Sequence, residues 1–205
     1  MRDGRHSVHL VRIALQSLNS ASRGLTWGDH GMRRLKTQTT GRERTFDPDE
    51  IIVSKTNPAG VITYANEVFV KVSGFTEAEL LGAPHNLIRH PDMPRCVFQF
   101  LWDRLGAGHE VFAYVVNQAR NGDHYWVLAH VTPTFDASGE IIGYHSSRRV
   151  PSRSAIGTAA GLYKTLRGIE LAHDDSDEGM AAAMAALVGT LQQAGVDYDE
   201  FAFSL

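Results

Sequence analysis

The sequence predicts an α+β domain in which two short strands precede a group of helices and three longer strands follow them. A turn at Asn57-Pro58-Ala59-Gly60 separates two β-branched runs, residues 51–56 and 61–64, as expected for a hairpin. Two later turns, Asn121-Gly122 and Asp136-Ala137-Ser138-Gly139, separate three strand-like runs, which indicates an antiparallel meander.

The segment between the two groups of strands carries start and stop signals for three helices. Asn66 begins a short helix that Gly74 ends, and Thr76-Glu77-Ala78-Glu79 matches a capping box ahead of a second helix. Pro94 suits the first turn of a longer helix that ends near Gly106. Apolar residues at helical spacing form its expected core stripe: Val97, Phe98, Leu101, Trp102 and Leu105.

Both faces of the predicted sheet require cover. In the strands Glu110–Gln118 and His124–Phe135 both alternating sets of side chains are largely apolar, so neither face is a simple solvent face. The third strand of the meander is Glu140–Val150. Residues 154–171 form an amphipathic helix that supplies cover either within the chain or from a dimer partner. An acidic break, residues 174–178, then precedes an Ala-rich final helix.

The composition is that of an ordinary globular protein, with 205 residues of which 43% are apolar and 21% charged. Residues 1–44 differ, because they hold nine Lys and Arg against three Asp and Glu. One short helix is marked within them by Val8, Val11, Leu15 and Leu18. We expect the rest of this stretch to be a basic, flexible tail rather than a targeting segment or a nucleic-acid arm.

Cysteine content and hydropathy limit the cellular setting. The single cysteine, Cys96, excludes an internal disulfide. The longest apolar run, Met180–Val188, has about half of the roughly 20 residues that a membrane span needs. We therefore expect a cytoplasmic protein with no membrane span and no nucleic-acid partner.

The stretch from Pro84 to Pro94 is the strongest local indication of a binding site. It reads Pro-His-Asn-Leu-Ile-Arg-His-Pro-Asp-Met-Pro. Prolines pre-set backbone angles and remove amide donors. Arg89, His90 and Asp92 are therefore expected on a short, stiff connector between helices.

Four motifs resemble the PAS domain of bacterial aerotaxis receptors, which hold FAD and report redox state. They are Ile62-Thr63-Tyr64-Ala65-Asn66, Val72-Ser73-Gly74-Phe75, Pro84 to Pro94, and Asn121 to Val127. Leu162-Tyr163-Lys164-Thr165-Leu166 resembles the stretch after that domain, so the likeness covers roughly residues 48–168. It implies a five-stranded antiparallel sheet with short helices on one face, plus flanking N- and C-terminal helices.

The resemblance divides the chain into four parts. Residues 1–46 are the basic tail, residues 47–151 the PAS sensor domain, residues 152–172 an amphipathic connector helix, and residues 173–205 the acidic break with the C-terminal helix.

The resemblance also assigns cofactor-binding residues. In these receptors the proline-flanked element that corresponds to Arg89, His90 and Asp92 is tied to FAD retention. A guanidinium suits a phosphate, an imidazole is a switchable donor or acceptor, and a carboxylate accepts from ribose hydroxyls. Three further residues match the receptor pattern: Asn66, Trp102 and Asn117. An amide can address the flavin edge, and an indole can stack on its face.

The implied function is a redox or oxygen sensor that binds FAD non-covalently, in signal transduction of the aerotaxis and chemotaxis type. We expect a homodimer and an output through another signalling protein in trans. Glu110 and Val111 stand where the receptor pattern has proline and tryptophan, so the pocket lining departs there. Hydrolase and phosphate-loop motifs are missing from the sequence, so we expect no enzyme. His124 and His130 lack accompanying ligands, so we expect no metal site.

Two alternatives stay open at this point. One is a PAS interaction module without a cofactor, whose pocket is filled by side chains and whose sheet mediates dimerisation. The other is a haem-binding PAS gas sensor, in which His85, His90 or His109 supplies the axial ligand.

Overall fold

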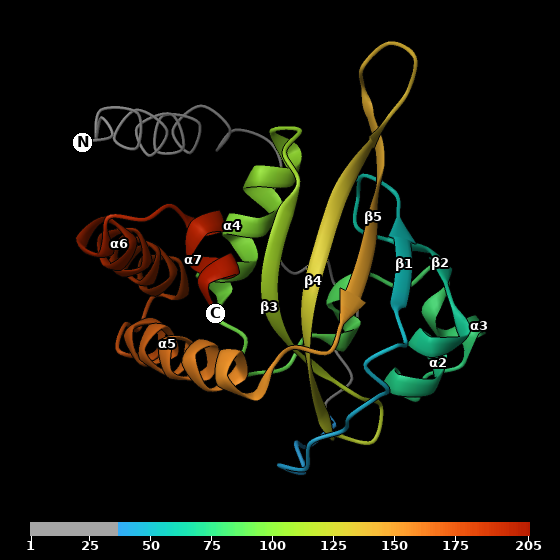
Figure 1. Cartoon of the computed structure of the whole chain (residues 1–205), viewed down its shortest axis with the longest axis horizontal. Helices are drawn as coiled ribbons and strands as arrows, with labels where there is room; N and C mark the ends of the chain where they lie inside the picture. The colour runs from blue at the N-terminus through green and yellow to red at the C-terminus, as the bar shows by residue number, and fades with distance from the viewer. Residues whose placement is uncertain (1–36) are drawn as a thin grey trace.

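The structure is a computed structural model that describes residues 37–205. The N-terminal helix expected around residues 8–18 lies outside the described residues. From residue 37 on, the chain forms one sheet with helices between the strands and three more helices at the C-terminus (Figure 1).

A five-stranded antiparallel sheet is the centre of the fold, which confirms the predicted class. In the order β2-β1-β5-β4-β3, the strands are β2 Ile62–Ala65, β1 Ile52–Thr56, β5 Ile141–Arg149, β4 His124–Phe135 and β3 Val111–Gln118. The bounds of β4 match the predicted strand, and β3 and β5 differ from prediction by one residue at their ends. Pairing of β1 with β5 joins the first hairpin to the meander.

The helices between β2 and β3 begin and end where their capping residues stand. They are α2 Glu67–Ser73, α3 Glu77–Leu80, the 3₁₀ helix η1 His85–Ile88, and α4 Arg95–Gly106. Asn66 caps α2, which ends at Gly74 with a φ of 73°, a conformation that favours glycine. Thr76 and Glu79 form the predicted capping box of α3. By contrast, α4 begins after Pro94, whose side chain makes no capping hydrogen bond.

Three C-terminal helices lie beside β3 and α4 (Figure 1): α5 Arg153–Leu171, α6 Ser176–Ala194 and α7 Tyr198–Ser204. The acidic break is present, and Asp175 within it caps α6. The separate helix α7 was not predicted, although Asp197 and Glu200 form a second capping box at its start. Taken singly, no helix of the described chain meets the length and apolarity expected of a membrane span, while the bent pair α6 and α7 together does.

Helix α5 covers the outer face of β3 and β4 from within the chain. Tyr114 on that face packs with Ala155 and Ala159, and the hydroxyl of Tyr163 donates to the Tyr114 carbonyl oxygen. Trp126 stacks on the Tyr163 ring at 5.8 Å between centroids. This face of the sheet is therefore covered by a helix of the same chain, which is the first of the two predicted sources of cover.

The described end of the expected tail, residues 37–46, lies against the start of β4. The amide of Arg44 donates to the carbonyl of His124 at 2.7 Å, and the amide of His124 donates to the carbonyl of Arg42 at 2.9 Å. The Thr40 hydroxyl donates to Asp123 at 2.6 Å. These hydrogen bonds hold residues 37–46 against the sheet.

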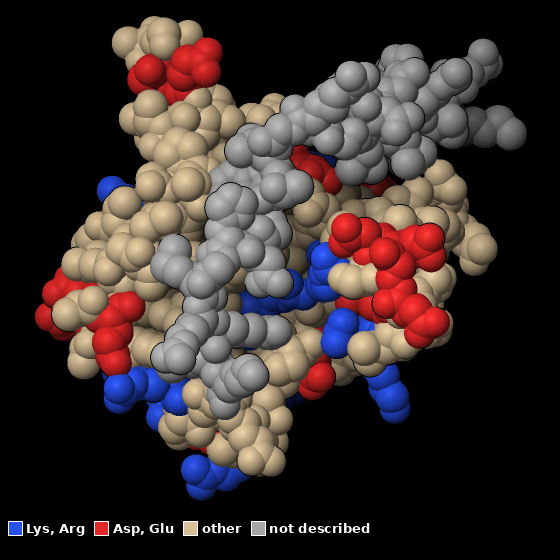
Figure 2. All heavy atoms as spheres, turned by 180° about the vertical axis from the view of Figure 1, so that it is seen from behind, with Lys and Arg blue, Asp and Glu red and all other residues tan. Residues whose placement is uncertain are grey.

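Charges of both signs share the face seen in Figure 2. Lys and Arg side chains lie beside Asp and Glu side chains in the part that the grey atoms leave visible. Two surface ion pairs of the described chain are Lys71 with Glu50 at 2.7 Å and Arg120 with Glu79 at 2.7 Å. In this visible part we see no continuous basic stripe of the kind that follows a phosphate backbone.

Candidate functional site

A cavity of about 80 Å³, partly open to solvent, lies between the inner face of the sheet and α4. Most of its wall is apolar, with Leu101 and Leu105 from α4 and Val111, Ala113 and Val115 from β3. Polar side chains join the wall from β1, β5, η1 and the connector after η1: Ser54, Thr56, Ser146, Arg148, His85 and Arg89. A cavity with apolar walls and a few convergent polar groups is the usual form of a small-molecule site.

Arg148 on β5 is the most unusual group in this wall. Its side chain is 2% exposed, its guanidinium donates to the Ser54 hydroxyl, and it stacks 4.5 Å from the centroid of the Phe69 ring. Within residues 37–205 it has no carboxylate partner, and its Nε and Nη1 are buried without a hydrogen-bond partner. Burial lowers its pKa to about 10, so at neutral pH it remains a cation with unmet hydrogen-bonding capacity.

Two more cavity groups have unmet polar atoms in the described chain. The amide nitrogen of Asn117 on β3 and the hydroxyl of Thr56 on β1 are buried and have no hydrogen-bond partner there. Native proteins leave few such atoms unsatisfied, and a bound ligand is one explanation. Together with Arg148, they give the cavity wall several buried donors that have no partner in the described chain.

Arg89 reaches the cavity from the connector. Its Nη2 donates to the carbonyl oxygen of Met93 at 2.9 Å, and its guanidinium lies 5.1 Å from the Phe98 ring centroid. A backbone bridge between Arg89 and Asn117 fixes the connector beside β3. The structure thus brings these two predicted residues together.

Trp102 on α4 also lines the cavity. Its indole meets the Tyr144 ring edge-on at 5.4 Å and the Phe98 ring at 6.1 Å. This packing holds a flat aromatic surface in the wall. Arg89, Trp102 and Asn117 are therefore the three predicted site residues that the structure places at the cavity.

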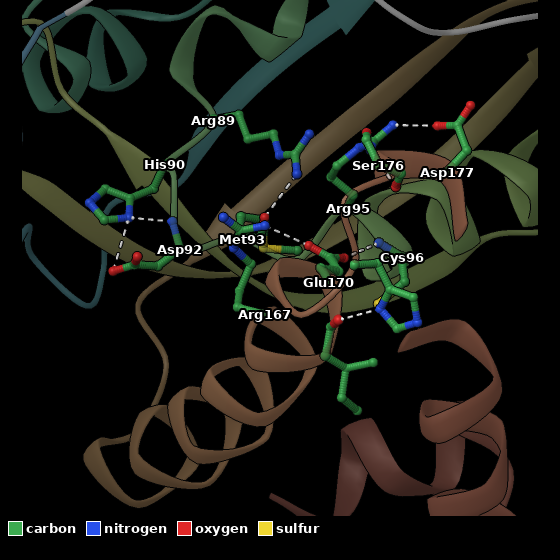
Figure 3. A network of polar contacts seen from close by, with 12 residues as sticks. Arg89, His90, Asp92, Met93, Arg95, Cys96, Arg167, Glu170, Ser176 and Asp177 are labelled. Atoms are coloured by element: carbon green, nitrogen blue, oxygen red, sulfur yellow. Dashed lines mark hydrogen bonds and ion pairs between the residues drawn. The ribbon is translucent and has the colours of Figure 1, made fainter. Parts of the chain in front are cut away.

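The other three predicted residues do not line the cavity. Asn66 accepts from the amides of Phe69 and Val53 at 3.0 Å each and donates to the carbonyl of residue 51 at 2.8 Å, so it holds α2 against β1. His90 and Asp92 point away from the Arg89 guanidinium (Figure 3). The His90 Nδ1 accepts from the Asp92 amide at 3.1 Å, and the Asp92 side chain is 84% exposed.

Sequence reasoning missed Arg148 and Thr56, and it named His85 only as a candidate haem ligand. The spacing along β5 could have identified Arg148. It follows Tyr144 and Ser146 at steps of two residues, so all three side chains lie on the inward face of the strand. A cation on the buried face of a strand needs a reason. The sequence does not show which face of this strand points inward, because that depends on the segments that pack beside it.

Of the three histidines considered for haem ligation, His85 lines the cavity and His90 and His109 do not. His85 lines the cavity, but its Nε2 is 3.1 Å from the Ser54 hydroxyl oxygen. Burial, with a smaller effect of the Arg148 charge, lowers the pKa of His85 to about 3, so its ring is neutral at pH 7. The His90 Nδ1 accepts a backbone amide, and His109 is exposed. An axial bond to His85 Nε2 would displace its contact with Ser54.

Comparison with known proteins gives one family and two kinds of relative. Residues 62–148 match the family model of the PAS fold. The aerotaxis receptor of Escherichia coli (strain K12) is 43% identical over 118 residues, which are 58% of this chain and 23% of the receptor. The nitrogen fixation regulatory protein of Klebsiella pneumoniae is 31% identical over 99 residues, which are 48% of this chain and 20% of that protein.

The chain therefore spans about a fifth of the length of either relative. Among solved structures, the light-state structure of the blue-light photoreceptor Aureochrome1 LOV is similar with a TM-score of 0.47 and 18% sequence identity. The match covers 58% of this chain and 91% of that one.

Proposed function

We propose that the chain is a sensor that binds FAD non-covalently in the cavity and reports redox or oxygen state. The match of residues 62–148 to the family model of the PAS fold supports a sensor. The resemblance of the motifs to the FAD-holding aerotaxis receptors supports FAD as the ligand, and the 43% identity to an aerotaxis receptor supports signalling as the role. The observation that carries the proposal is the buried Arg148 cation, which has unmet donors and lines a mostly apolar cavity that Asn117 also lines.

The chemistry of the wall fits a flavin. An isoalloxazine ring is flat and apolar on its faces, and it has carbonyl oxygens and ring nitrogens along one edge. Arg148 and Asn117 would donate to that edge, and Trp102 would cover part of a face. Arg89 would bring a second positive charge to the nucleotide. When bound, FAD supplies reversible electron transfer.

Arg148 and Asn117 also explain how redox state reaches the protein. A fixed cation in a low-dielectric cavity favours each added negative charge near it. The Asn117 amide can offer either a donor or an acceptor to the flavin edge. Asn117 lies on β3, whose outer face contacts α5 through Tyr114 and Tyr163. A changed pairing at Asn117 therefore acts on a strand that α5 also contacts.

The partners are part of the same proposal. The hairpin of β4 and β5 extends beyond the rest of the sheet (Figure 1) and exposes Phe135 and Ile142, which are 47% and 53% exposed. Exposed apolar side chains of this kind favour protein contacts. We assign them to a homodimer or to a signalling protein in trans, in the cytoplasm.

The test is an absorbance spectrum of the natively purified chain, followed by titration with FAD. We expect flavin bands, and Arg148→Gln should lower FAD affinity at least about tenfold, since a buried charged hydrogen bond contributes about 1.5–3 kcal/mol. Arg149→Gln is the matched control, because Arg149 is the next residue and is exposed. A colourless protein that FAD cannot reconstitute contradicts the proposal, and a haem band would favour the gas sensor.

A further inference from the structure

The N-terminus of α4 is capped by a residue from another helix. The first amides of a helix have no partner within it, and Pro94 provides no side-chain cap. The Cys96 amide instead donates to Oε1 of Glu170 on α5 at 2.9 Å (Figure 3). The other carboxylate oxygen accepts from Arg167 at 2.7 Å. A carboxylate also suits the positive end of the helix dipole.

The same short segment is held from the cavity side by Arg89. Its guanidinium donates to the Met93 carbonyl oxygen at 2.9 Å. Met93 is fully buried and lies three residues before Cys96. Residues 93–96 are therefore fixed at one end by a cavity side chain and at the other by Glu170. A displacement of Met93 cannot leave the Cys96 amide in place.

Helix α6 is tied to the same point. Arg95 donates to the Ser176 carbonyl oxygen at 2.8 Å and pairs with Asp177 at 3.1 Å. Gly179 lies so close to α5 that a Cβ there would overlap the Glu170 carbonyl oxygen. Buried apolar residues complete this junction: Met93, Cys96, Val97, Tyr163, Leu166, Ala183 and Leu187.

From this geometry we infer that Glu170 couples the cavity to helices α5 and α6. A cavity ligand that draws the Arg89 guanidinium from the Met93 carbonyl shifts residues 93–96, and Glu170 moves with the Cys96 amide. The inference rests on the proposed function for the identity of the ligand and the role of its redox state. The coupling itself depends only on residues of this chain.

Linkage makes the coupling testable in both directions. If cavity occupancy changes the packing of α5 and α6, a substitution at Glu170 that shifts this packing must also change ligand affinity. A residue that only stabilises the fold lacks this property. Typical couplings between protein sites correspond to about fivefold or more in an equilibrium constant.

The first experiment is hydrogen exchange on the full chain, without FAD, with oxidised FAD, and with FAD reduced by dithionite. In the wild type we expect FAD or its reduction to change amide exchange in α5 and α6 by about fivefold or more. Glu170→Met removes both acceptors at similar volume and should abolish this response. Glu170→Gln keeps one acceptor for the Cys96 amide and should restore most of it.

Glu178→Gln is the matched control, because Glu178 is an exposed carboxylate in the first turn of α6. It should respond like the wild type. Gly179→Ala tests the junction from the α6 side and should weaken the response as Glu170→Met does. An unchanged response in Glu170→Met, or none in wild-type protein that binds FAD, overturns the inference and leaves the proposed function standing.

A second experiment does not depend on the cofactor. In the unliganded chain, Arg89→Met and Glu170→Met form a double-mutant cycle, read as the exchange rate of the Cys96 amide. Coupled residues give a combined effect that differs from the product of the two single effects. If FAD does not bind, the proposed function fails, but this cycle still tests the coupling. Single effects that simply multiply in the double variant would overturn the coupling of Arg89 and Glu170.

Discussion

Arg148→Met is expected to stabilise the unliganded protein and to weaken FAD binding. The guanidinium is buried with two nitrogens that have no partner in the described chain, a state that suits a ligand and not the empty domain. Methionine has a similar length and no charge, so it fills the same space without that cost. The opposite signs of the two effects separate a binding residue from a structural one.

The magnitude follows from the buried charge. The fall in the pKa of Arg148 from 12.5 to about 10, at 1.36 kcal/mol for each pKa unit, corresponds to about 3 kcal/mol against the charged form. Loss of the contact with the Phe69 ring offsets about 2 kcal/mol, of which a thioether recovers about 0.5–1 kcal/mol. Ser54 keeps its contact with His85. The net expectation from these terms is a gain of about 1.5–2 kcal/mol in the free energy of unfolding.

The assay is urea unfolding of the FAD-free chain, compared with FAD titration of the same preparation. Arg149→Met is the control, since an exposed neighbour should change stability by less than about 0.5 kcal/mol. A loss of about 1 kcal/mol or more in unliganded Arg148→Met would refute the reasoning. It would mean that the folded chain already compensates the guanidinium, and the argument for a ligand there would fail.

Three further predictions concern His85, a tight turn and a cap. The pKa of His85 is about 3 in the fold, against an ordinary value of 6.5 in the unfolded chain. The unfolded chain therefore binds the extra proton, and stability falls as the pH drops from 6.5 towards 3. Lowering the pH from 7 to 5 should cost about 2 kcal/mol through this group, and His85→Gln should remove that part of the urea-measured loss while exposed His109→Gln should not. Gly122→Ala should lower the free energy of unfolding by more than about 2 kcal/mol, because φ is 92° and a Cβ would overlap a backbone oxygen. Gly139→Ala, with φ of 87° and open space around it, should lower it by only about 1 kcal/mol. Equal shifts in melting temperature for the two variants would contradict this reasoning. Asn66→Ala should lower the free energy of unfolding by about 1–2 kcal/mol, because α2 loses its cap. The FAD affinity of the folded fraction should stay within about twofold of wild type. A tenfold or greater loss of affinity would mean that Asn66 belongs to the binding site.

Local signals in the sequence determined most of the secondary structure. Turn residues and caps act on their immediate neighbours, so the Asn121-Gly122 hairpin, the Gly74 helix end and the Thr76 capping box are present where they were predicted. Helix α7 was missed although Asp197 and Glu200 carry the same signal. The proline-rich connector and its Arg89 were also identified from local chemistry and family likeness.

The tertiary structure alone decided which side chains meet. Pairing of β1 with β5 places Ser54 beside Arg148, 94 residues away, and Glu170 caps α4 from a distance of 74 residues. Such contacts depend on strand order and helix packing, which no local pattern specifies. The sequence by itself could therefore determine the domain, its elements and half of the cavity residues proposed from the family, whereas the buried cation and the junction at Glu170 arise only when distant segments pack together.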